Sequence, residues 1–133
     1  MRTLPHPGID EEALYNRLQE RRQSNAANLL LNAKQQVFAA YSKYKAEELP
    51  ILETVIDDQD TAEHLRSNYK VLRSGTLSAE GAKILARSRI CCLCGLRNTA
   101  ELDHYLPKQI FPEFAAHTVN LVPVCGTVSY THL

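Results

Sequence analysis

The chain has 133 residues, in which 15 lysines and arginines are balanced by 15 aspartates and glutamates. A content of 44% hydrophobic and 23% charged residues excludes a disordered or membrane-embedded protein, and the length suits one domain or a small domain with a helical extension. No apolar run reaches the roughly 18 residues of a spanning helix, and the start of the chain lacks the apolar region of a secretory signal. We therefore expect a cytoplasmic protein without a membrane partner.

The net charge of zero conceals an asymmetry along the chain. Residues 1–65 carry seven basic and eleven acidic residues, whereas residues 66–133 carry eight basic and four acidic ones. A basic half of this kind indicates a polyanionic partner. Alone it is weak evidence, because most lysine and arginine runs are solvated helix faces.

The first part of the chain shows two segments with helical periodicity. Asp10 is expected to cap a helix over residues 11–22, where apolar residues recur at helical spacing. A longer helix should begin at Ser24 or Asn25 and end before Pro50, because proline disfavours helix in the preceding residue.

Two further helices are expected before the composition changes. Asp60 and Glu63 resemble a capping box for a helix that ends near Arg73. Ser78 is expected to cap a short helix that ends at about Ala86. The sequence thus predicts a helical region over residues 1–88.

From Ile90 onward the sequence has a different character. All four cysteines and three of the five histidines lie after this point, and short apolar segments replace helical periodicity. Strands are expected over 101–106 and 121–124, with one or two helical turns at 112–116. We therefore expect an α+β chain with a second unit over residues 89–126.

The cysteines suggest a metal site. Cys91 and Cys94 form a C-x-x-C pair followed by glycine, and Cys125 is also followed by glycine. Thiolates at this spacing on a tight turn can share a tetrahedral zinc ion, although the position expected for the fourth ligand is occupied by Val128. Buried free thiols and a redox pair remain alternatives, and Cys92 would be a poor fourth ligand because of its geometry.

An acid and an imidazole stand side by side in the next strand. Asp103 and His104 lie between Leu102 and Leu106, and adjacent strand residues point to opposite faces unless the strand ends or bends. Pro107 provides such an end. This pair suits a bound metal with a general base, but a partly buried histidine and a turn-capping aspartate are the simpler interpretations of each residue alone.

Together these pieces resemble the HNH endonuclease family. The matching segments occur in the order Cys91–Cys94, Leu102–Pro107 and Asn120–Gly126, and they cover about a third of the chain. The resemblance implies a ββα-metal module that follows the helical region and is held together by structural Zn²⁺.

The resemblance also implies roles for individual residues. His104 resembles the general base, Asp103 a ligand of the catalytic Mg²⁺ or Mn²⁺, and Asn120 the residue that holds the loop and orients the histidine. Double-stranded DNA is the implied substrate. Its phosphates would be contacted by basic residues, for which the candidates are Arg87, Arg89, Arg97 and Lys108.

The match breaks down at the C-terminus, where the family has a final helix with further ligands. Residues 127–133 resemble the translated end of a transposon used to prepare sequencing libraries, so we expect a non-native tail in which His132 is no ligand. On this hypothesis the chain is a truncated form that binds zinc poorly and has little nuclease activity, whereas its full-length parent is an endonuclease.

Two other function classes remain open at this point. One is a zinc-stapled nucleic-acid-binding module without catalysis. The other is a helical adaptor or effector subunit of a defence system, whose residues 1–88 would bind a protein partner.

Overall fold

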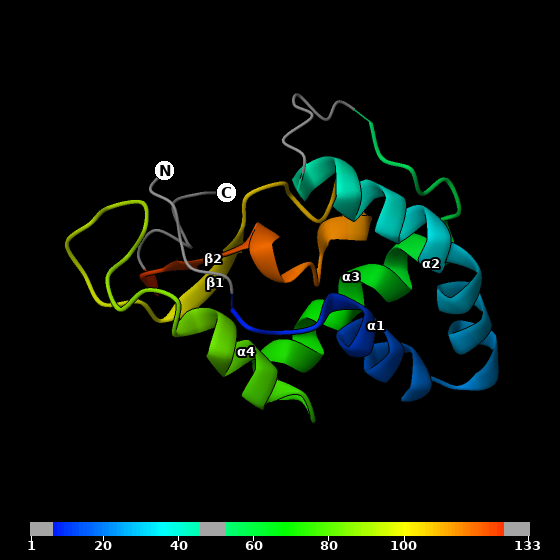
Figure 1. The fold of residues 1–133 in the computed structure, drawn as a ribbon, viewed down its shortest axis with the longest axis horizontal. Helices are drawn as coiled ribbons and strands as arrows, with labels where there is room; N and C mark the ends of the chain where they lie inside the picture. Colours follow the sequence, from blue (N-terminus) through cyan, green and yellow to red (C-terminus); the bar gives the residue numbers. More distant parts are fainter. Residues whose placement is uncertain (1–6, 46–52, 127–133) are drawn as a thin grey trace.

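The structure is a computed structural model that describes residues 7–45 and 53–126. Within these ranges it contains four α-helices and one two-stranded antiparallel sheet, and therefore has the expected mixed α+β class. The sheet lies toward one end of the molecule beside the fourth helix, and the first two helices lie toward the other end (Figure 1). No helix in the described ranges combines the length and apolar character that crossing a membrane requires.

The first two helices confirm the prediction made from the spacing of apolar residues. Helix α1 spans Glu11–Glu20, two residues shorter than expected, and the Asp10 carboxylate accepts the backbone N–H groups of Glu12 and Ala13 at 2.9 and 3.1 Å. Helix α2 spans Ser24–Lys45. The proline expected to limit α2 lies outside the described residues.

The expected caps of the next two helices were wrong. Helix α3 spans Gln59–Ser74 and is capped by Asp58, whose Oδ2 accepts both the backbone N–H and the hydroxyl of Thr61. Helix α4 spans Ser78–Leu85, so Ser78 is its first helical residue and makes no cap. The helices themselves were predicted correctly because periodicity depends on many residues, whereas a cap depends on one.

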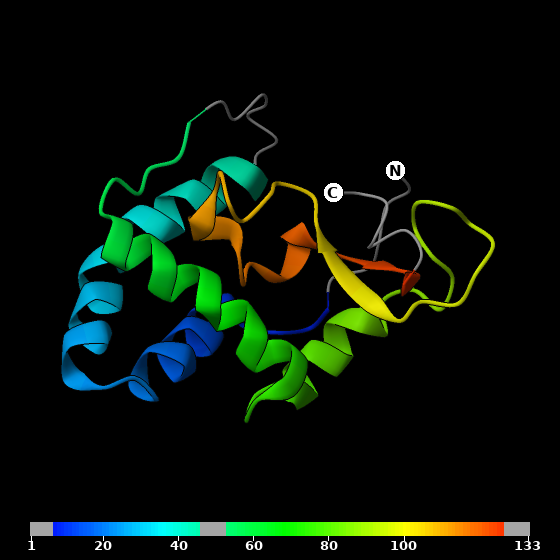
Figure 2. The same cartoon turned by 180° about the vertical axis from the view of Figure 1, so that it is seen from behind.

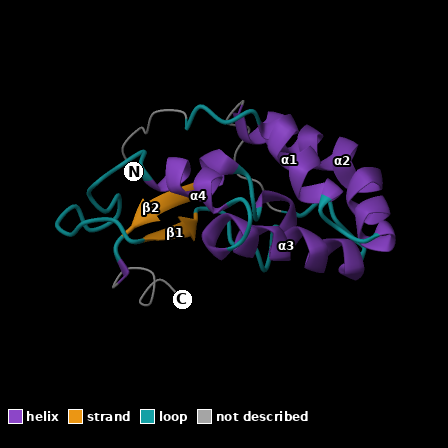
Figure 3. Cartoon of the chain, turned by 90° about the horizontal axis from the view of Figure 1, so that it is seen from below, coloured by secondary structure: helices purple, strands orange, loops and turns teal. Residues whose placement is uncertain are grey.

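The sheet consists of strand β1, Glu101–His104, and strand β2, Leu121–Val124. Their antiparallel register pairs Asp103 with Val122 and His104 with Leu121. The connection between the strands contains two short 3₁₀ turns, η1 at Pro112–Phe114 and η2 at Thr118–Asn120. Figure 3 shows this small sheet beside α4 and apart from α1 and α2.

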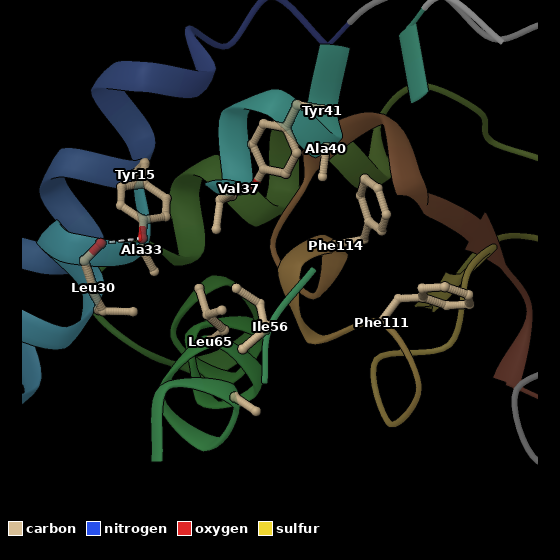
Figure 4. Close-up of a cluster of buried hydrophobic side chains, with 11 residues drawn as sticks. Tyr15, Leu30, Ala33, Val37, Ala40, Tyr41, Ile56, Leu65, Phe111 and Phe114 are labelled. Carbon is tan, nitrogen blue, oxygen red and sulfur yellow. Dashed lines mark hydrogen bonds between the residues drawn. The ribbon is translucent and has the colours of Figure 1, made fainter. Parts of the chain in front are cut away.

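The helices and the connection between the strands share hydrophobic clusters. Phe111 and Phe114 of the connection pack with α1, α2 and α3, and Tyr41 of α2 stacks near Phe114 at 6.1 Å between ring centroids (Figure 4). A second cluster joins Leu102 and Leu121 of the sheet to α1, α3 and α4. Residues 89–126 therefore pack directly against the helical region. Each of the two clusters contains residues from before and after the boundary expected near residue 88.

Three arginines of the helical region also hold the backbone of the later segment. Arg66 donates to the carbonyls of residues 108 and 109 at 3.0 Å each, and Arg73 donates to the carbonyl of residue 100 at 3.0 Å. Arg87 donates to the carbonyls of residues 118 and 121. Figure 2 shows from behind how α3, which carries Arg66 and Arg73, runs alongside the turns that connect the two strands.

Candidate functional site

The fold places His104 at the end of β1 with its imidazole held from one side. Its Nε2 lies 2.9 Å from the backbone oxygen of Ala115. A carbonyl oxygen only accepts hydrogen bonds, so Nε2 carries the proton and Nδ1 carries the lone pair of the neutral ring. Burial lowers the pKa of His104 below its ordinary value. The hydrogen bond with Ala115 opposes this effect, Lys108 lowers the pKa further, and Asp103 raises it by a smaller amount. The imidazole is therefore neutral, and able to accept a proton, at neutral pH.

Asp103 precedes His104 on β1 and is half-buried. Its Oδ1 accepts the backbone N–H of His104 at 2.9 Å. Among the described residues, the one group of three or more cysteine, histidine or acidic side chains close enough to hold a metal ion consists of cysteines. The described residues therefore do not by themselves fit a catalytic Mg²⁺ or Mn²⁺ ion, because a single carboxylate is too small a ligand set.

Asn120 is fully buried and closes the connection between the strands. Its Oδ1 accepts the N–H of Leu106 at 2.9 Å, and its Nδ2 donates to the carbonyls of Leu106 and Phe114 at 3.1 Å each. This one side chain thereby ties Leu106, near the start of the connection, to Phe114, the residue before Ala115. Asn120 acts on His104 through this loop, which supplies the carbonyl that holds the imidazole.

Three of the four cysteines come together as predicted. The Sγ atoms of Cys91, Cys94 and Cys125 lie within 4.8 Å of one another, and those of Cys94 and Cys125 are 3.8 Å apart. Gly95 has a φ of +69°, the left-handed conformation that lets the chain turn after Cys94. This cluster can bind a metal ion.

The backbone around the cluster favours thiolates. Burial raises the pKa of Cys91, but N–H donors from Cys94, Cys125 and Leu93 outweigh it and lower the pKa to about 6. Cys92 is half-buried and does not join the cluster, in agreement with its expected poor geometry. The position expected for the fourth ligand, Val128, lies outside the described residues, as does the whole tail 127–133.

The four basic residues predicted to contact phosphates lie in different surroundings. Arg87 is half-buried and donates to backbone carbonyls, whereas Arg89 and Arg97 are exposed around the cysteine turn. Lys108 lies in the loop after β1 with its Nζ 4.8 Å from the ring centroid of Tyr69. Burial lowers the pKa of Lys108, and nearby Lys70 and Arg66 lower it further.

Sequence analysis did not identify the contribution of α3 to this site. The Tyr69 ring lies 4.6 Å from the His104 ring, and its hydroxyl donates to the carbonyl of Leu102 at 2.7 Å. The residues are 33 positions or more apart, so no local pattern reveals the contact. The basic character of residues 66–133 was the signal in the sequence that pointed toward α3, and it does not point to Tyr69.

A half-buried carboxylate joins α1 to the η2 turn that ends at Asn120. Glu11 Oε1 accepts the backbone N–H of Thr118 at 3.0 Å and also the Thr118 hydroxyl. Burial raises the pKa of Glu11 to about 7; Asp10 adds to this, while Thr118 and Arg87 oppose it. His117 Nε2 lies 4.0 Å from the same Glu11 oxygen, and the His117 ring stacks on the ring of Tyr41.

We expect the stability of the protein to depend on pH through Glu11. Its folded pKa lies above the unfolded value of 4.5, so its contribution is greatest below pH 4.5 and is lost as the pH rises through about 7. At about 1.4 kcal/mol per pKa unit, the loss is on the order of 3 kcal/mol. Glu11→Gln keeps an acceptor for Thr118 without the charge, so urea unfolding from pH 5 to 8 should show a flatter profile. Parallel profiles for both proteins would contradict this, and the exposed Glu12→Gln is the control.

Comparison with protein-family models, with curated proteins and with solved structures finds no match for this chain. The resemblance to HNH endonucleases therefore depends on the pattern of residues described above. Any function must be argued from the geometry of the site.

Proposed function

We propose that this chain carries the general-base part of an HNH endonuclease centre that hydrolyses phosphodiester bonds in double-stranded DNA. The observation that carries the proposal is the hydrogen bond from His104 Nε2 to the Ala115 carbonyl. Because that bond leaves the lone pair on Nδ1, this atom can take a proton from water as the water oxygen attacks phosphorus and the 3′ oxygen leaves. The lowered pKa of His104 supports the role, since the base must be neutral before it acts.

Two further features support a nuclease. Asn120 holds the loop that orients His104, which is the role that the family resemblance assigns to it. Lys108 lies near the imidazole, and Arg89 and Arg97 are exposed, so these three cations are the best candidates for phosphate contacts. Asp103 is the described candidate ligand for a catalytic divalent ion, and we expect cleavage to require further ligands in addition to it.

The experiment compares His104→Ala with the unchanged chain. Nicking of supercoiled plasmid in Mg²⁺ or Mn²⁺ is measured for the 133-residue chain and for a form extended by a C-terminal helix with a histidine or asparagine ligand. We expect little nicking by the shorter form. In the extended form His104→Ala should reduce nicking by about 10²–10⁴-fold without changing DNA affinity, because only proton transfer is lost. His64→Gln on α3 is the control.

Equal nicking by His104→Ala and the unchanged extended form would reject the proposal. A second candidate function is a zinc-stapled nucleic-acid-binding module without catalysis, and the single described carboxylate at Asp103 favours it. Salt-dependent DNA binding without nicking by either form would select this second function.

We also propose that Cys91, Cys94 and Cys125 bind structural Zn²⁺. Three thiolates whose sulfur atoms lie within 4.8 Å of one another can supply three corners of a tetrahedral site. With three described cysteine ligands, the chain should bind one zinc equivalent more weakly than a four-thiolate site would, as measured in competition with a chromophoric chelator. Cys94→Ser should weaken the affinity by about 10²-fold or more, because a hydroxyl is a poor zinc ligand at neutral pH.

Cys92→Ser is the matched control for the zinc experiment, because Cys92 is adjacent to the cluster but outside it. It should leave zinc affinity unchanged. An equal loss in Cys92→Ser and Cys94→Ser would contradict the proposed ligand set, and the absence of zinc binding by the unchanged chain would reject the site in this form of the protein.

A further inference from the structure

One aromatic residue of the helical region contacts the strand, the imidazole and a nearby cation at once. The Tyr69 hydroxyl donates to the carbonyl of Leu102, its ring lies against His104, and the Lys108 ammonium lies over the same ring. We propose that Tyr69 is a positioning residue for His104, so that α3 forms a wall of the site. This inference rests on the proposed function of His104 as the base.

The hydroxyl and the ring of Tyr69 contact β1 at two positions. Leu102 and His104 are two residues apart on β1, and residues at that spacing project from the same face of a strand. The Tyr69 hydroxyl donates to the Leu102 carbonyl at 2.7 Å, and the Tyr69 ring lies against the ring of His104, two residues further along β1. The observed centroid distance of 4.6 Å and interplanar angle of 57° fit a tilted aromatic contact.

The imidazole is restrained from two directions as a result. Ala115 holds Nε2 through its carbonyl oxygen, and Tyr69 lies against the ring. The hydrogen bond alone allows the ring to pivot about the Nε2 contact, whereas the aromatic ring limits that motion. Tyr69 thereby keeps Nδ1 aimed in one direction, which a general base requires for efficient proton transfer.

The Tyr69 ring also contacts the cation of Lys108. Lys108 Nζ lies 4.8 Å from the Tyr69 centroid, within the range of a cation–π contact. The loop that carries Lys108 is held to α3 by Arg66, which donates to the carbonyl of Lys108 itself. Tyr69 thus contacts both the proposed proton acceptor and a candidate phosphate-binding cation.

The experiment follows the His104 Nε2–H proton by NMR exchange with water, using the full 133-residue chain. Tyr69→Leu should accelerate this exchange about tenfold or more, because the imidazole gains freedom to leave Ala115. Tyr69→Phe, which keeps the ring, should stay within about twofold of the unchanged protein. The Tyr105 amide, which donates to the Asn120 carbonyl at 3.0 Å, is the internal reference for the surrounding fold.

The outcomes are decisive in both directions. Selective acceleration at His104 with an unchanged Tyr105 amide supports positioning, whereas no acceleration, or equal acceleration at both protons, overturns it. Tyr105→Leu removes an exposed tyrosine next to His104 and should have no effect. Should Tyr69→Leu fail to fold, the unchanged protein still decides, because absence of a nuclear Overhauser effect between the Tyr69 and His104 rings overturns the contact.

Cleavage kinetics separate this inference from the proposed function. In the extended form, Tyr69→Leu should lower kcat for cleavage with KM nearly unchanged, since the base is misaligned while DNA contacts remain. Normal cleavage by His104→Ala would reject the proposed function while the exchange measurement still reported on the ring contact. Normal kcat in Tyr69→Leu beside inactive His104→Ala would overturn only the positioning role.

Discussion

Asn120→Ala is expected to destabilise the protein by about 3–5 kcal/mol and to disorganise the loop that holds His104. The substitution removes the partner of the Leu106 N–H and of the carbonyls of Leu106 and Phe114 in a buried position. Each buried polar group left without a partner costs about 1–3 kcal/mol. Urea unfolding measures the loss, and accelerated exchange of the His104 Nε2–H proton reports on the loop.

Two further variants make this prediction specific. Asn120→Asp retains the acceptor for Leu106 but loses both donor bonds and adds a buried charge, so it should be at least as harmful above neutral pH. Asn32→Ala, at an exposed position of α2, should change stability by less than about 0.5 kcal/mol. A loss below about 1 kcal/mol in Asn120→Ala would show that water replaces these hydrogen bonds and that Asn120 does not hold the loop.

Gly81→Ala should be the second severe substitution, although alanine is the better helix former. A Cβ atom at Gly81 would lie 1.8 Å from the backbone oxygen of Leu72 and 2.8 Å from its carbonyl carbon, so α3 and α4 would have to separate. Overpacking of this kind costs about 1–3 kcal/mol or more, which exceeds the gain of about 1 kcal/mol in helix propensity. Because the obstacle is backbone at 1.8 Å, we expect the cost to lie at the upper end of that range and the net destabilisation in urea unfolding to be about 2 kcal/mol.

The separation of α3 and α4 in Gly81→Ala should also disturb the candidate site. Helix α4 leads directly to Arg87, which holds the carbonyls of residues 118 and 121 on either side of Asn120. Gly81→Ala should therefore also accelerate exchange in β2. Ala82→Ser, at the next and exposed position of α4, is the control and should be nearly neutral. Stabilisation by Gly81→Ala would mean that propensity dominates and that the close helix contact yields.

Most of the secondary structure could be predicted because its causes are local. The apolar spacing of α1 and α2 and the two short apolar segments of β1 and β2 place these elements within a few residues. The caps of α3 and α4 were predicted less well. The sequence pattern favoured Asp60, but α3 begins at Gln59 and is capped by Asp58, whose carboxylate binds Thr61.

The candidate site was predicted in part for the same reason. The C-x-x-C spacing identified two candidate ligands, and the repeated Cys-Gly pair identified Cys125, which the fold brings close to them. The residue pattern also identified Asn120, whose side chain does close the loop. Arg87 shows the limit of this reasoning, since its positive charge suggested phosphate contact whereas its Nη1 donates to two carbonyls.

The sequence by itself therefore determined the helices, the strands, the cysteine turn and the Asp103–His104 pair, because these depend on neighbours within a few positions. The tertiary structure alone decided that Tyr69 lies against His104, that Glu11 binds Thr118 across 107 positions, and that Gly81 must lack a side chain. The reason is physical. Contacts between distant segments depend on how whole helices pack, and packing is set by the combined shapes of many side chains.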